Sequence, residues 1–198
     1  MSSTNRGYDR HKSDYYVTPV KAINKFLKVF EVTECIDWKN HVVLDPCAGG
    51  DENHDMSYPK ALIERGLTAP RLCTIDIRED SKAMMIGNYL EYELSKGLKD
   101  ILTMIITNPP FNQAEKIIEK ALNDINEGGY VVMLLRLNYF GSKKRNKWLL
   151  NNMPKCCYIH SKRMSFTENG STDSIEYAHF VWRKGWHNNF TETYLLEY

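Results

Sequence analysis

The chain has 198 residues, 42% of them hydrophobic, which is enough to bury one sizeable core and short for two domains. Its formal net charge is only +1, from 26 basic and 25 acidic residues, so no global field draws it to nucleic acid and any such attraction must come from local patches. The five cysteines form no CxxC pair and no zinc-like spacing with histidine, which predicts reduced thiols and no metal site.

The N-terminal segment, residues 1–13, is polar and carries scattered charge without the apolar stretch of a signal peptide. No later run approaches membrane-spanning length. We therefore expect a disordered tail over residues 1–13, a single domain over residues 14–198, and a soluble cytoplasmic protein.

The first predicted elements are a helix and two strands. Thr18 is expected to cap a helix that starts at Pro19 and carries one apolar stripe. Residues 41–45 predict a short strand that opens into the loop Pro46-Cys47-Ala48-Gly49-Gly50. Residues 72–76 predict a second strand, which ends on an aspartate.

A continuous apolar run over residues 101–106 is rich in β-branched side chains and is cut off by prolines, which indicates a buried central strand. A helix is expected over residues 112–125, another buried strand over 130–135, and later strands at 156–159 and 177–182. Because strands and helices alternate, the predicted fold class is α/β, a mostly parallel doubly wound sheet with an antiparallel strand near the C-terminal end.

The four residues that follow the central strand, Asn108, Pro109, Pro110 and Phe111, lie at a carboxyl end, where open α/β sheets bind ligands. The side-chain carbonyl of Asn108 and the main-chain carbonyl of Pro109 can each accept one hydrogen of an NH2 group. Phe111 offers a face on which a ring can stack. The alternative is a strand stop without chemical role, since Asn-Pro often opens a turn. The coincidence of an acceptor, two prolines and an aromatic ring favours the functional interpretation.

The stretch Asn108-Pro109-Pro110-Phe111 resembles the Asn/Asp-Pro-Pro-aromatic catalytic motif of S-adenosylmethionine-dependent amino methyltransferases, especially the small phage-type N6-adenine DNA enzymes. The motif order is similar: Thr-Pro comes first, then Asp-Pro-Cys-Ala-Gly-Gly, then Asn-Pro-Pro-Phe, and the likeness extends over residues 14–182. The resemblance implies a Rossmann-like class I methyltransferase fold, S-adenosylmethionine as cofactor, DNA as partner, and the host cytoplasm as location if a phage encodes the chain.

The resemblance also implies a set of cofactor contacts. The loop after the first strand would meet the methionine part, the acid after the second strand would hold the ribose, and the Thr-Pro segment would meet the carboxylate. Many relatives carry an acid where this chain has Asn88, which would accept from the adenine amine without charge. The implied positions are Thr18, Asp45, Cys47, Gly49, Gly50, Asp76, Asn88 and Asn108. Independently, glycines permit close backbone approach and an acid at a strand end suits ribose hydroxyls.

The implied reaction is direct transfer of the sulfonium methyl group to the N6 amine of a flipped-out adenine, without a metal. A dense basic region suits phosphate contacts, although a solvated surface helix is the alternative. Its members are Lys143, Lys144, Arg145, Lys147, Lys162 and Arg163. Phe166 lies where family members place a second aromatic ring against the flipped base, with ordinary core packing as the alternative.

Three other functions fit the same motif or region. Adenine in RNA would use the same four residues on an unpaired base. A protein-glutamine methyltransferase would also present an NH2 group to Asn-Pro-Pro, but it would not need the basic cluster. A noncatalytic nucleic-acid-binding subunit would have no use for Asn108 and Asp76. The stretch between Arg136 and Asp173 is too short for a large target-recognition domain, so we expect sequence preference either to be minimal or to reside in a separate partner.

Overall fold

The structure, a computed structural model, describes residues 17–166 and 175–198. The tail expected over residues 1–13 lies outside these ranges. So do residues 14–16 of the Thr-Pro segment and residues 167–170, which are part of the stretch that resembles the methyltransferase family. Within the described ranges, no helix combines the length and the apolar character needed to cross a membrane.

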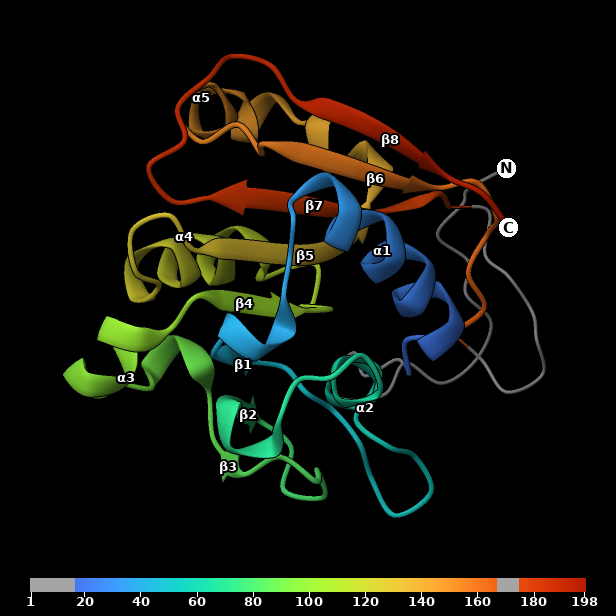
Figure 1. Cartoon of the computed structure of the whole chain (residues 1–198). Coiled ribbons are helices and arrows are strands. Elements are labelled where there is room, and N and C mark those ends of the chain that lie inside the picture. Colours follow the sequence, from blue (N-terminus) through green and yellow to red (C-terminus); the bar gives the residue numbers. More distant parts are fainter. Residues whose placement is uncertain (1–16, 167–174) are drawn as a thin grey trace.

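The centre of the fold is one eight-stranded sheet with the order β3-β2-β1-β4-β5-β7-β6-β8 (Figure 1). All neighbouring pairs are parallel except those of β7, which runs antiparallel to β5 and β6. The predicted α/β class, with a mostly parallel sheet and a late antiparallel strand, is confirmed. The strands are β1 Val43–Asp45, β2 Leu72–Asp76, β3 Met85–Ile86, β4 Met104–Thr107, β5 Tyr130–Arg136, β6 Cys156–His160, β7 Tyr177–Arg183 and β8 Glu192–Leu196.

Helices cover both faces of the sheet (Figure 1). The helices α1 Val20–Thr33 and α2 Ser57–Glu64 pack on one face. The helices α3 Lys96–Ile101, α4 Ala114–Asp124 and α5 Lys143–Asn151 contribute to the other. Because both faces are buried, successive residues of β4 face opposite cores: Ile105 packs toward α4, and Ile106 packs toward α1. The unbroken apolar run of this strand follows from that double cover.

The strand order places the carboxyl ends of β1, β2, β4 and β5 at one edge of the sheet. The order reverses between β1 and β4, which is the position where open α/β sheets form a ligand crevice. Residues that lie far apart in the sequence, such as Asp45 and Asn108, therefore start neighbouring loops.

Two local predictions were wrong. The helix α1 begins at Val20 with Pro19 as its N-cap, and no side-chain cap bond is formed, because the Thr18 hydroxyl points to another partner. The central strand begins at Met104 and not at residue 101, because Ile101 ends the short helix α3. The edge strand β8 was not predicted, since its burial is confined to its last residue and it carries no apolar run.

A chain of four hydrogen-bonded side chains joins the C-terminal residue to α2 through β6 and β7. Tyr198 Oη contacts His160 Nδ1 at 2.5 Å, His160 Nε2 contacts His179 Nδ1 at 2.8 Å, and His179 Nε2 contacts Tyr58 Oη at 2.9 Å. Burial lowers the pKa of His160 to about 4 and the pKa of His179 well below its usual value. Both imidazoles are therefore neutral in the folded protein at neutral pH.

This network predicts acid sensitivity. An imidazole in the unfolded chain titrates near pH 6.5, so the unfolded state takes up protons that the folded state does not, and stability falls as the pH drops from about 6.5 toward about 4. We expect the melting temperature of the wild type, followed by circular dichroism, to fall more between pH 7 and pH 5 than that of His160→Gln, which has one titrating imidazole fewer. Titrating groups that both proteins share cancel in this comparison, and equal falls would contradict the prediction.

Candidate active site

The side chain of Asn108 is held at the carboxyl end of β4 by a contact from a distant segment. Its Nδ2 donates to Thr18 Oγ1 at 3.0 Å, and Thr18 is buried just before α1. Its Oδ1 is buried and has no hydrogen-bond partner among the residues described. Because the nitrogen is already used, the carbonyl oxygen is the side-chain group of Asn108 that remains to bind a ligand.

A second acceptor lies next to it. Pro109 is buried, and its main-chain carbonyl takes part in no hydrogen bond between residues of the described ranges. The carbonyl of Pro110 is different, since it accepts from the backbone N–H of Gln113 at 2.9 Å and so closes a turn before α4. The loop therefore presents two consecutive carbonyl acceptors that no described residue donates to, one from a side chain and one from the main chain.

Phe111 does not offer a bare stacking surface. The guanidinium of Arg136 lies over its ring, 4.8 Å from the centroid, and the ring centroid of Tyr177 lies 5.9 Å away. Tyr177 also contacts Phe166 edge to face, with centroids 5.0 Å apart. The two aromatic residues expected to meet a target base, Phe111 and Phe166, thus belong to one cluster, but their shared partner Tyr177 and the cation of Arg136 were not foreseen.

The loop after β1 is fixed by side chains that follow β2. Asp76 Oδ2 accepts from the N–H of Gly49 at 2.7 Å, while Arg78 Nη2 donates to the carbonyl of Gly50 at 2.8 Å. Ser81 Oγ donates to the carbonyl of Gly49 at 2.5 Å. Both glycines have positive φ, 66° and 74°, where a side chain is strained. The predicted ribose acid and the predicted glycine loop are therefore in direct contact.

Asp45 is a fully buried acid at the end of β1. Its Oδ1 accepts from the N–H of Cys47 at 3.2 Å, whereas Oδ2 has no hydrogen-bond partner and the carboxyl has no ion pair within the described part of the chain. Burial raises the pKa of Asp45 to about 7, and the nearby Asp76 carboxylate contributes to the rise. Burial also raises the pKa of the Cys47 thiol, so this thiol stays protonated and unreactive at neutral pH. A buried acid without a counter-ion is suited to a cationic ligand group.

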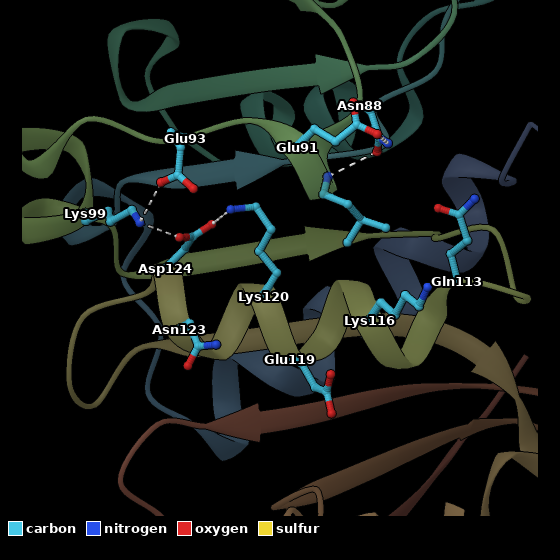
Figure 2. Close-up of a pocket in the computed structure, with 11 residues that line it drawn as sticks. Asn88, Glu91, Glu93, Lys99, Gln113, Lys116, Glu119, Lys120, Asn123 and Asp124 are labelled. Atoms are coloured by element: carbon cyan, nitrogen blue, oxygen red, sulfur yellow. Dashed lines mark hydrogen bonds and ion pairs between the residues drawn. The ribbon is translucent and has the colours of Figure 1, made fainter.

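Asn88 caps the 3₁₀ turn η3 Tyr89–Glu91. Its Oδ1 accepts from the N–H of Leu90 at 3.1 Å and its Nδ2 donates to Glu91 at 2.8 Å, so the carbonyl keeps one lone pair for a further donor. An open groove of about 760 Å³ begins here, with Asn88 and Gln113 at the end toward which β4 points (Figure 2). At the other end the buried carboxylate of Asp124 bridges two lysines. The groove is lined by Asn88, Leu90, Glu91, Glu93, Lys99, Gln113, Lys116, Glu119, Lys120, Asn123 and Asp124.

The basic residues predicted to bind nucleic acid do not form one cluster. Lys143, Lys144 and Lys147 are exposed on α5, and Lys162 and Arg163 are exposed after β6. Arg145 has a structural role: its guanidinium lies 3.9 Å from the ring centroid of Tyr139, donates to the Tyr139 carbonyl at 2.5 Å and to Glu115 at 3.3 Å. Arg163 lies 3.6 Å from Glu176 at a solvent-exposed position.

Two residues at this edge were missed. Ile77 directly follows Asp76 and is 59% exposed, so an apolar side chain stands in solvent beside the predicted ribose acid. The sequence did contain a signal for Ile77, because this residue comes directly after the acid that ends the second predicted strand. Arg136 is the last residue of β5. The signal in the sequence was a charged residue at the end of an otherwise apolar strand.

The glycine loop can be tested by stability. A Cβ on Gly50 would lie 2.8 Å from the Cγ of Met56 and φ is +74°, whereas a Cβ on Gly97 in α3 would meet nothing within 4 Å. We expect Gly50→Ala to lower the free energy of unfolding by about 2 kcal/mol, because of left-handed strain and the clash. Gly97→Ala should raise it by roughly 0.5 kcal/mol. Urea unfolding measures both, and a Gly50→Ala protein as stable as the wild type would contradict the prediction.

No protein-family model matches the sequence, and no curated protein sequence matches it. Solved structures do. A protein from Listeria monocytogenes proposed to be a class I S-adenosylmethionine-dependent methyltransferase is similar over 91% of this chain and 65% of its own, with TM-score 0.60 and 15% identity. A protein from Pyrococcus horikoshii proposed to be an RNA methyltransferase is similar over 92% and 93%, with TM-score 0.62 and 15% identity.

The methyltransferase subunit of a type I restriction-modification system from Streptococcus thermophilus matches over 91% of this chain and 47% of its own, with TM-score 0.62 and 10% identity. This chain thus spans less than two thirds of the Listeria protein and about half of the Streptococcus subunit. At these identities the likeness concerns the backbone. The chain has the Rossmann-like fold of class I methyltransferases.

Proposed function

We propose that this chain transfers the methyl group of S-adenosylmethionine to the exocyclic N6 amine of adenine in DNA. The observation that carries the proposal is the state of Asn108. Its amide nitrogen is held by Thr18, and its buried carbonyl oxygen has no partner within the described residues. An unpaired buried acceptor costs free energy, so its presence at a ligand-binding sheet edge indicates a donor that arrives with the substrate.

The residues present fit the cofactor. Asp76 would hold the ribose hydroxyls, and the loop Gly49-Gly50 would let the methionine part approach the backbone closely. The unpaired Oδ2 of buried Asp45 suits the ammonium group, and exposed Ile77 suits a face of the adenine ring. When bound, S-adenosylmethionine supplies an electrophilic methyl carbon on a sulfonium sulfur. The description of the similar Listeria protein as a proposed S-adenosylmethionine-dependent enzyme supports this choice.

The role of the catalytic loop is to activate a poor nucleophile. The amine of adenine donates its lone pair into the ring, so it attacks carbon weakly. Asn108 Oδ1 and the carbonyl of Pro109 accept its two hydrogens, which localises the lone pair on nitrogen and directs it to the methyl carbon. As the N–C bond forms, the carbon–sulfur bond would break with its electron pair remaining on sulfur, which leaves as the neutral thioether. The surplus proton of the methylated amine would pass to water. In a duplex this amine is out of reach, so the base must leave the stack.

Support for DNA comes from the similar restriction-modification subunit and from the exposed lysines of α5. The similar Pyrococcus protein is proposed to act on RNA, so RNA is the nearest alternative. Incubation with tritiated S-adenosylmethionine and separate pools of duplex DNA, single-stranded DNA, RNA and protein distinguishes these substrates. Label in RNA alone would replace the DNA assignment, and label in protein alone would replace both nucleic acids.

The Asn108→Ala variant tests the catalytic loop. Loss of the side-chain acceptor should lower turnover at least about 100-fold, because one hydrogen-bond acceptor in the transition state is removed. Cofactor affinity, measured by calorimetry, should stay within about threefold of the wild type, since Asp45 and Asp76 are unchanged. Normal turnover in this variant would remove Asn108 from the mechanism.

Thr18 is predicted to be a positioning residue. Thr18→Val keeps the shape but leaves the Nδ2 of Asn108 without its acceptor, so the amide can rotate, and turnover should fall about tenfold. Thr18→Ser keeps the hydroxyl and should retain at least half of the activity. The Michaelis constant for the nucleic acid should change little in either variant. Equal losses in Thr18→Val and Thr18→Ser would contradict the role of the hydrogen bond, because Thr18→Ser keeps the hydroxyl that accepts from Asn108.

A further inference from the structure

Arg136 occupies the same sheet edge as the catalytic loop. It is the last residue of β5, whose Met133 pairs with Thr107 of β4, so Arg136 lies beside the loop that begins at Asn108. On its other side it pairs with Tyr177 of β7. The arginine therefore stands between the two carbonyl acceptors and the aromatic cluster.

The guanidinium of Arg136 has no counter-ion among the described residues. Its carbon lies 4.8 Å from the centroid of Phe111, and its Nε is buried without a hydrogen-bond partner in the same part of the chain. Within residues 17–166 and 175–198, no carboxylate pairs with it. A positive charge left without a partner so close to a protein interior costs free energy that an anionic ligand would recover.

Two other arginines of the described residues also lie over aromatic rings. Arg145 lies over Tyr139, and its guanidinium is satisfied by Glu115 and by a backbone carbonyl. Arg183 lies over Tyr130, is exposed to solvent and donates to a backbone carbonyl. Of these three arginines, Arg136 is the one whose Nε is buried without a hydrogen-bond partner in the described ranges.

We infer that Arg136 binds a phosphate group of the target strand, next to the nucleotide whose amine meets Asn108. This rests on the proposed function and deepens it, because a guanidinium fork recognises phosphate and a protein amide substrate would carry none. Stacking on Phe111 holds the fork in place before the ligand arrives. One positively charged contact is then built into the catalytic edge of a chain whose net charge is only +1.

The test compares two arginines on the same pair of strands. Arg183 pairs with Tyr130 at the opposite end of the β5–β7 ladder, where its guanidinium carbon is 5.3 Å from the ring centroid of Tyr130. Arg136→Gln and Arg183→Gln make the same charge change at opposite edges. Binding of a fluorescein-labelled, adenine-containing single-stranded DNA is measured by anisotropy over a range of KCl concentrations, and cofactor binding by calorimetry verifies folding.

For Arg136→Gln we expect about tenfold weaker DNA binding and a salt slope reduced by about 0.7, the value for one phosphate on a single strand. Arg183→Gln should change affinity less than twofold and leave the slope intact. Arg136→Lys should keep the wild-type slope, because the charge remains, but should bind the DNA about threefold more weakly, because an ammonium cannot form the two-pronged contact. This loss of affinity is the readout if the glutamine variant does not fold.

An unchanged slope in Arg136→Gln, or an unchanged affinity in Arg136→Lys, would overturn the phosphate contact. These outcomes are separable from failure of the proposed function. A wild-type protein that binds the oligonucleotide but never methylates nucleic acid would overturn the activity, while the slopes would still decide the role of Arg136. A wild type that binds no nucleic acid would overturn both.

Discussion

The hydrogen bond from Asn108 to Thr18 is the contact on which the candidate active site depends. It joins side chains 90 positions apart and uses the amide nitrogen as donor, so the carbonyl oxygen is left for a ligand. Thr18 is in place because α1 packs across the sheet through apolar residues such as Phe26. The hydrophobic burial of α1 therefore fixes the orientation of the Asn108 amide, and this orientation leaves its carbonyl oxygen free to accept a hydrogen bond from a ligand.

A second constraint of the same kind shapes the neighbouring loop. The carboxylate of Asp76 accepts the N–H of Gly49 and that of Arg78, so β2 fixes the backbone that follows β1. Asp45 is buried nearby without a counter-ion in residues 17–166 and 175–198, and the free-energy cost of its burial is offset by the surrounding core. Uncompensated groups of this type concentrate at functional sites. In this chain they lie at one edge of the sheet, and the fold-level likeness to class I methyltransferases is consistent with that location.

The antiparallel strand β7 completes the edge. Because it runs against its neighbours, its first residue, Tyr177, lies where β4 and β5 end. Tyr177 then contacts both Phe111 and Phe166, and it pairs with Arg136. A strand that follows the Asn108 loop by almost 70 residues thus supplies an aromatic side chain to the candidate site, and the reversal of a single strand is sufficient to bring it there.

The sequence by itself determined the elements whose cause is local. The apolar run and the acid of β2 predicted the bounds that the structure has, 72–76, and the prolines after β4 correctly predicted where that strand ends. It could not determine partners. Four features depend on residues far apart in the chain. Arg145 contacts Tyr139 and Glu115, and Arg136 lies over Phe111. The hydroxyl of Thr18 binds Asn108 and does not cap α1, and β8 pairs with β6. Backbone propensity and apolar period act over a few residues, whereas these contacts exist only after the sheet has assembled and both of its faces have been covered.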